Sequence, residues 1–136
     1  MTAGPKLVSI LRQGTTLIAS IHTALDDTQM VRFRDDLIEQ IGRYRSRGVI
    51  IDVAALDVLD SFGARTLRTI GELARLRGAA TVIVGIQPDV AFAMVSLGMS
   101  TGTLETALDL EEGLDYLNSR LSRRDGPGTS RGVPVR

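Results

Sequence analysis

The stretch Val49–Arg65 reads Val-Ile-Ile-Asp-Val-Ala-Ala-Leu-Asp-Val-Leu-Asp-Ser-Phe-Gly-Ala-Arg. Its first part, Val49–Val53, is almost entirely β-branched, which is typical of a strand that is buried on both faces. A loop with acidic residues follows, and Asp60-Ser61 then supplies the side chains that favour the start of a helix. The stretch therefore predicts a strand–loop–helix unit that carries a hydroxyl group, that of Ser61, at the beginning of the helix.

The chain before this unit predicts a hairpin and a helix. Two short apolar segments, Leu7–Leu11 and Leu17–Ile21, flank Gly14, which suits a tight turn. Asp26-Asp27-Thr28 is a helix-start signal, and apolar residues then recur at helical spacing. We expect Gly48 to end this helix and the inward positions to be Met30, Phe33, Leu37, Ile41 and Tyr44.

The chain after this unit alternates in the same way. Gly78 is expected to close the second helix, and Thr81–Val84 is a buried-type strand that ends at Gly85. Pro88 suits the first turn of a helix over Asp89–Leu97. A short edge strand is expected within Thr101–Thr106. Asp109 caps a last helix, whose apolar stripe is Leu110, Leu114, Leu117 and Leu121.

This order predicts an α/β fold with a mixed sheet of four to five strands, opened by a β-hairpin and flanked by about four helices. Strand–helix–strand units imply neighbouring parallel strands joined by right-handed crossovers. We assign residues 1–121 to one domain. Residues 122–136 have no periodicity and are rich in Arg, Gly and Pro, so we expect them to be a disordered tail.

Composition limits the classes of function. The formal net charge is zero and aromatic residues make up 4%, which disfavours binding to nucleic acid or to an anionic membrane surface. The absence of cysteine excludes thiol chemistry and is compatible with the cytoplasm, where we expect the protein to work. His22 is the only histidine, which leaves a histidine metal cluster or a catalytic triad without its parts.

Motifs for nucleotide chemistry are missing. The sequence has neither Gly-x-x-x-x-Gly-Lys-Ser/Thr nor Gly-x-Gly-x-x-Gly, and its only lysine is Lys6. A phosphate-accepting aspartate among Asp52, Asp57 and Asp60 would need an acidic pair after the first strand to hold Mg²⁺, and none is there. We therefore expect no enzymatic activity, no cofactor and no metal.

Ser61 admits two interpretations. A phosphate on it would meet the positive end of the helix dipole and free backbone N–H groups. It would also place about −1.5 to −2 charges beside Asp60, which should disturb any partner that docks there and separate it from the apolar ring of Phe62. The simpler interpretation is that Asp60-Ser61 is only a helix cap, since Asp and Ser are common caps.

A family resemblance favours the first interpretation. Leu59-Asp60-Ser61-Phe62-Gly63 after the Val-Ile-Ile-Asp-Val strand resembles the STAS domain of anti-sigma factor antagonists, in which the hydroxyl after the Asp is phosphorylated. Two further blocks, in the right order, resemble the RsbS-type branch of stressosome scaffold proteins. They are Gly85-Ile86-Gln87-Pro88 with Val90-Ala91, and Glu105–Glu111 with Gly113-Leu114.

The resemblance implies a non-catalytic phospho-switch and scaffold. Ser61 would be phosphorylated by a switch serine kinase of the RsbT type, which the protein sequesters, and a serine phosphatase would reverse the modification. The protein would dimerise and assemble with RsbR-type paralogues, thereby regulating a stress-response sigma factor pathway. The residues expected around the phosphosite are Asp60, Phe62, Gly63, Arg65, Gln87 and Pro88.

Two other interpretations stay open. The first is a direct antagonist that binds an anti-sigma kinase one-to-one; its common motif has a second hydroxyl where this chain has Phe62, which argues against it. The second is a STAS module that binds a nucleotide or lipid, for which the sequence selects no ligand.

Overall fold

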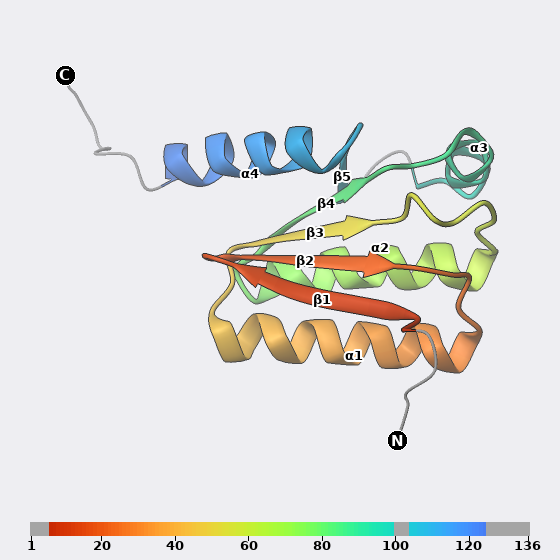
Figure 1. The fold of residues 1–136 in the computed structure, drawn as a ribbon, viewed down its shortest axis with the longest axis horizontal. Coiled ribbons are helices and arrows are strands. Elements are labelled where there is room, and N and C mark those ends of the chain that lie inside the picture. The colour runs from red at the N-terminus through yellow and green to blue at the C-terminus, as the bar shows by residue number, and fades with distance from the viewer. Residues whose placement is uncertain (1–5, 100–103, 125–136) are drawn as a thin grey trace.

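The computed structural model describes residues 6–99 and 104–124 of the chain. The elements are β1 Val8–Gln13, β2 Thr16–Ile21, α1 Asp27–Tyr44, β3 Gly48–Asp52, α2 Ser61–Leu76, β4 Ala80–Val84, α3 Pro88–Ser96, β5 Leu104–Ala107 and α4 Leu110–Arg124. The strands form one five-stranded sheet in the order β1-β2-β3-β4-β5, as Figure 1 shows. β1 pairs antiparallel with β2, and the other neighbours are parallel. The expected mixed α/β fold is confirmed.

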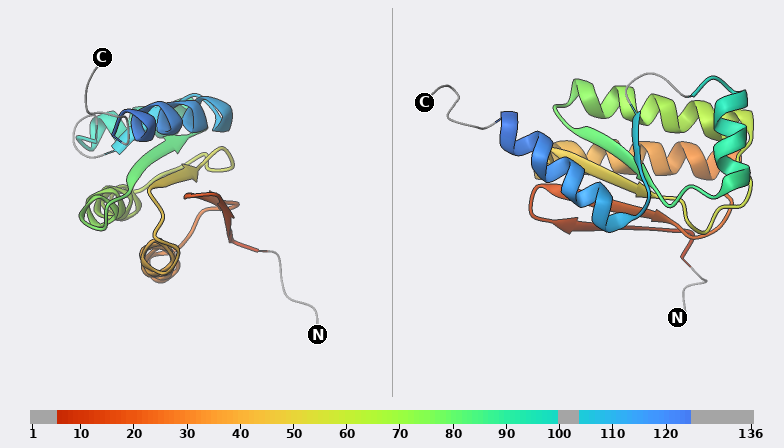
Figure 2. Two further views of the ribbon diagram at one scale, coloured as in Figure 1. Left: turned by 90° about the vertical axis from the view of Figure 1, so that its left-hand side faces the viewer. Right: turned by 90° about the horizontal axis from the view of Figure 1, so that it is seen from above.

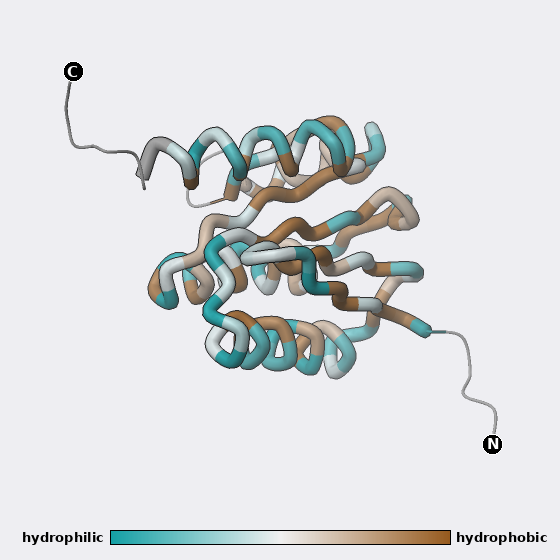
Figure 3. The backbone as a smooth tube through the Cα atoms, turned by 60° about the vertical axis from the view of Figure 1, so that its left-hand side comes forward, coloured by the Kyte–Doolittle hydropathy of each residue, from teal (hydrophilic) through white to brown (hydrophobic). Residues whose placement is uncertain are grey.

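The central strand β3 is buried on both faces because helices cover both. Val49 and Ile51 pack into a large core beneath the sheet, and Ile50 packs into a smaller core above it. Figure 2 (left) shows α1 and α2 on one side of the sheet and α4 on the other. Hydrophobic residues accordingly follow the strands and alternate with hydrophilic ones along the helices in Figure 3.

The close approach of α4 to the sheet depends on a small residue. A Cβ added at Gly113 would lie 2.8 Å from Val84 Cγ1, which is closer than real Cβ atoms come. Leu117, one turn further along α4, is fully buried in the smaller core. Asp109 Oδ1 accepts a hydrogen bond of 2.9 Å from Glu112 N and caps the helix, as predicted.

Two expectations about α1 were wrong. Its start is as predicted, since Asp26 and Gln29 form a capping box. Its end is Arg45, in the left-handed conformation at φ 51°, whereas Gly48 is the first residue of β3. Tyr44 is 37% exposed instead of inward-facing, because its ring packs against the guanidinium of Arg12 from the hairpin. The Cζ atom of Arg12 lies 4.5 Å from the centre of the ring.

The carboxy-terminal boundary also differs. α4 continues to Arg124, so the predicted boundary between residues 121 and 122 falls inside this helix. Residues 125–136 lie outside the described residues, as do residues 100–103 in the region of the predicted edge strand. β5 itself pairs with β4 and is the edge of the sheet. In the described ranges no helix combines the length and the apolar character needed to cross a bilayer.

Candidate functional site at the start of helix α2

Asp60 caps α2. Its backbone is extended, at φ −86° and ψ 175°, and its Oδ1 accepts a 2.7 Å hydrogen bond from Gly63 N. A carboxylate at this position satisfies one of the free amides of the first turn and complements the positive end of the helix dipole. The sequence left open whether Asp60 or Ser61 is the cap, and the structure assigns the role to Asp60.

The side chain of Ser61 therefore does not cap the helix. It is the first helical residue, it is exposed, and within the described part of the chain its hydroxyl forms no hydrogen bond. A hydroxyl in this position can be reached from solvent without local unfolding. Neighbouring backbone N–H groups of the first turn point toward the same end of the helix, where an anion is favoured.

The two residues after Ser61 face the core. Phe62 is half-buried and packs against the large core, so only part of its ring is available to a partner. Gly63 is buried, and a Cβ there would lie 3.1 Å from both Asp60 Oδ1 and Leu59 Cδ1. The missing side chain thus makes room for the capping carboxylate.

Arg65 lies on the outside of the same helix. It is exposed, and it follows Ser61 at the i+4 position, so the two side chains share one face of α2. Arg68, one turn further on, is exposed as well. This face places positive charge within reach of any negative charge that Ser61 acquires.

Gln87 and Pro88 lie at this end of the molecule because they follow β4, which runs parallel to β3. Gln87 Nε2 donates a 2.7 Å hydrogen bond to the carbonyl of Ala54, which belongs to the loop after β3. Pro88 is the exposed first residue of α3. The loops after β3 and β4 are therefore tied together, and in Figure 1 α3 lies at the same end of the sheet as the start of α2.

Sequence reasoning did not predict the roles that three residues have at this end, namely Asp52, Leu56 and Val58. Asp52 Oδ1 accepts a 2.9 Å hydrogen bond from Ala54 N and shapes the loop before the helix. Val58 is 60% exposed. It lines a small hollow of about 110 Å³ beside Asp60 and Gly63, together with Leu56 and other apolar residues. Only Asp52 carried a signal, since Asp commonly bonds to the backbone two residues on.

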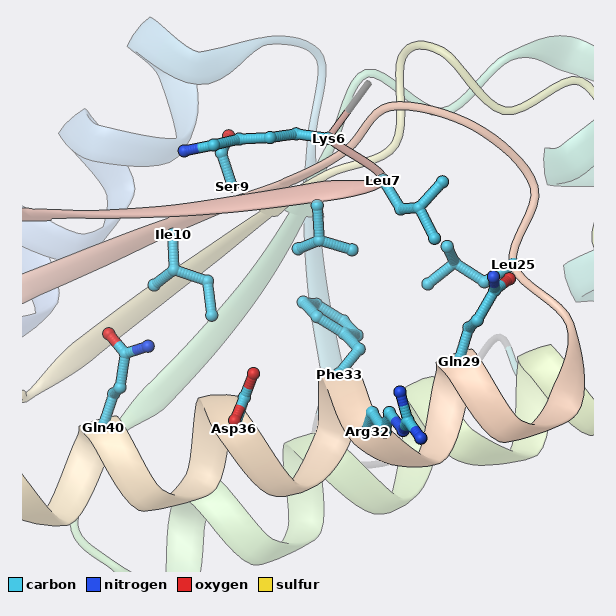
Figure 4. A pocket seen from close by; sticks show the side chains of 11 residues that line it. Lys6, Leu7, Ser9, Ile10, Leu25, Gln29, Arg32, Phe33, Asp36 and Gln40 are labelled. Atoms are coloured by element: carbon cyan, nitrogen blue, oxygen red, sulfur yellow. The ribbon is translucent and has the colours of Figure 1, made fainter. Parts of the chain in front are cut away.

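A second hollow, between β1 and α1, has a volume of about 520 Å³ (Figure 4). Its floor includes Ile10 and Phe33, and Lys6, Arg32 and Asp36 stand around it. None of the predicted site residues lines it. Nowhere in residues 6–99 and 104–124 do three or more His, Cys, Asp or Glu side chains gather in a way that could hold a metal ion.

Comparisons with known proteins identify a domain family and similar folds. A family model described as the STAS domain matches residues 8–113. The RsbT co-antagonist protein RsbRA of Bacillus subtilis (strain 168) is 29% identical over 90 residues, which are 66% of this chain and 33% of that protein. The chain thus spans about a third of the length of this curated relative.

Solved structures match over most of their length. An RsbS variant of Moorella thermoacetica is 34% identical, with a TM-score of 0.76, and the match covers 85% of this chain and 98% of that one. A chain from the stressosome, described as a signal integration and transduction hub, is 32% identical with a TM-score of 0.69. That match covers 83% of this chain and 98% of the stressosome chain.

Proposed function

Because the chain belongs to the STAS domain family and is similar to stressosome proteins over most of its length, we propose that it is a non-catalytic phospho-switch and scaffold of a stressosome-like complex. One observation carries the proposal: Ser61 is exposed at the first position of α2 and its hydroxyl has no partner in the described residues. In this proposal an RsbT-type serine kinase phosphorylates Ser61 with ATP in the cytoplasm. A serine phosphatase then removes the phosphate.

The surroundings of Ser61 form the proposed docking face, which comprises Asp60, Phe62, Gly63, Arg65, Gln87 and Pro88. The small apolar hollow beside Asp60 and the exposed Val58 offer a partner a place for one apolar side chain. Gly63 contributes through the shape of the cap and not through contact, since it is buried. The hydrogen bond from Gln87 to Ala54 holds the face together before any partner arrives.

Phosphorylation acts on this face through charge. The phosphate adds about −1.5 to −2 charges next to Asp60 and a bulky anion at the mouth of the helix. Arg65 on the same face and the amides of the first turn stabilise that anion locally. The modified protein therefore keeps its fold, while a partner seated on the unmodified face meets an unfavourable charge. The sequestered kinase is released in this way.

The site is tested by mapping the phosphate. The protein is incubated with a matching RsbT-type kinase and ATP, and the labelled residue is identified by mass spectrometry. Ser61→Ala should abolish the label, whereas Ser96→Ala, which removes another exposed helical serine, should keep it. Label that persists on another residue in Ser61→Ala would end the assignment.

The scaffold role is tested by mass. Light scattering with an RsbR-type paralogue should give particles far larger than a dimer. In a separate binding assay, phosphorylated protein or Ser61→Asp should bind the kinase at least about tenfold more weakly than Ser61→Ala. A small one-to-one complex with an anti-sigma kinase, and no large particle, would instead establish a direct antagonist.

A further inference from the structure

The outer edge of β1 is open. β1 is the first strand of the sheet, and among the described residues only β2 pairs with it. Its pairing with β2 continues from Val8 to Gln13 without a bulge, and the segment Val8-Ser9-Ile10 contains neither a charge nor a proline. Natural monomers usually protect an edge strand with such features, because its free N–H and C=O groups can pair with another chain. The first half of β1 lacks this protection.

The backbone groups of Val8 and Ile10 face outward from this edge. His22 N donates a 2.8 Å hydrogen bond to Leu7 O, which belongs to the segment just before β1. Residues of an antiparallel strand alternate between bonding to the neighbouring strand and facing away from it. Ser9 therefore bonds to β2 in its turn, whereas the N–H and C=O groups of Val8 and Ile10 are available to a further strand.

A hollow of about 520 Å³ lies beside this edge, between β1 and α1. Its apolar lining includes Val8, Ile10, Leu25 and Phe33, and Figure 4 shows Ile10 pointing from β1 toward α1. Val8, Ile10 and Leu25 are only half-buried. A further strand beside β1 would send alternate side chains into this hollow, because facing residues of antiparallel strands place their side chains on the same face of the sheet.

The α1 wall of the hollow carries charges whose order complements itself. Arg32 and Asp36 line the hollow, are exposed and stand one helical turn apart. Within the described residues neither of them forms an ion pair. A two-fold axis that pairs two β1 strands antiparallel also makes the two α1 helices antiparallel. Arg32 of each copy then faces Asp36 of the other, so the charges favour a second copy of this chain as the occupant.

We propose that two copies of this chain associate through their β1 strands about a two-fold axis, so that their sheets become continuous. Val8 of each copy pairs with Ile10 of the other, and Ser9 faces Ser9 across the axis. This register sets apolar side chains against each other beside both hollows. Centring the axis on Ile10 would instead set Val8 against Arg12, whose guanidinium packs on Tyr44.

Sedimentation velocity of the full chain over a range of concentrations tests the association. A monomer–dimer equilibrium is expected. The interface goes beyond the proposed phospho-switch and does not include Ser61, so Ser61→Asp should dimerise as the parent does. A chain that stays monomeric at every concentration would overturn the proposal and leave the assignment of Ser61 untouched. Loss of the dimer in Ser61→Asp would place the interface on the face of the phosphosite instead.

Charge reversal tests the identity of the occupant. Arg32→Asp and Asp36→Arg should each weaken the dimer by about tenfold, because two attractive contacts across the axis become repulsive. A mixture of these two variants should dimerise again, since each then supplies the charge that the other lacks. Arg68→Asp, at an exposed position of α2, should leave the dimer unchanged. Two variants that fail to associate when mixed, or an equal loss in Arg68→Asp, would overturn the pairing of the two α1 helices.

A disulfide tests the register. The chain has no cysteine, so single substitutions report on one position each. Ser9 is expected to face Ser9 as a pair without backbone hydrogen bonds, with Cα atoms about 4.5 Å apart, which a disulfide can bridge. Ser9→Cys should therefore give a covalent dimer on mild oxidation, whereas Thr15→Cys in the hairpin turn should not. A dimer that Ser9→Cys fails to cross-link, or that Thr15→Cys cross-links equally, would refute the proposed pairing of β1.

Discussion

Removing the cap of α2 tests how the structure presents Ser61. Asp60→Ala deletes the 2.7 Å hydrogen bond from Gly63 N to Asp60 Oδ1. Loss of an N-cap costs about 0.5–2 kcal/mol, and this bond is short and accepted by a carboxylate at the positive end of the dipole. We therefore expect the free energy of unfolding to fall by about 1.5 kcal/mol and Tm to fall by about 5 °C for a chain of this size.

Urea unfolding followed by circular dichroism measures this change, which should appear as a lower midpoint with an unchanged slope. Asp60→Asn keeps an acceptor and should lose less than half as much stability. Asp57→Ala removes an exposed loop carboxylate without a cap and should stay within about 0.5 kcal/mol of the parent. Equal losses for Asp60→Ala and Asp57→Ala would refute the assignment of Asp60 as the residue that holds the start of the helix.

Further substitutions test the packing around the two ends of the strands. Gly85→Ala should lower the free energy of unfolding in urea by about 2–3 kcal/mol, because Gly85 has φ +77° and a Cβ would lie 2.9 Å from Ala54 Cβ. Gly14 has φ +61° and nothing within 4 Å of an added Cβ, so Gly14→Ala should lower it by only about 1 kcal/mol in the same assay. Leu117→Ala removes a fully buried side chain and should lower the free energy of unfolding by about 2–5 kcal/mol, measured by thermal unfolding; a loss below about 1 kcal/mol would contradict the packing of α4 on the sheet. Gln87→Ala loses one hydrogen bond to Ala54 O and should cost about 1 kcal/mol, with faster amide exchange confined to the loop after β3; unchanged exchange there would show that the bond does not hold the loop.

Patterns among neighbouring residues predicted much of the fold. β-branched runs, capping residues and helical spacing are properties of neighbouring residues, so the caps Asp26 and Asp109 and the buried strand β3 followed from the chain alone. Tyr44 was misplaced for the opposite reason. Its spacing along the helix predicts that the side chain faces the core, but its ring packs against Arg12 from the hairpin. This contact joins distant parts of the chain.

The candidate site divides in the same way. The sequence alone determined that an acid and a serine, either of which can cap, stand side by side at the start of a helix, because capping depends on residues a few positions apart. It also predicted neighbouring parallel strands, and this arrangement brings the loops after β3 and β4 to one edge, since parallel strands end together. Which of Asp60 and Ser61 is the cap, and that the other is left free, came only from the three-dimensional arrangement.

Tertiary structure alone decided the contacts that join separate elements. The hydrogen bond from Gln87 to Ala54, the close fit of Gly113 against Val84, and the descent of Arg77 onto Gly42 have no local signature. Each depends on how closely two elements approach once the core is packed. Periodicity states which face of an element is apolar, but the distance between elements is set by all the side chains that fill the space between them.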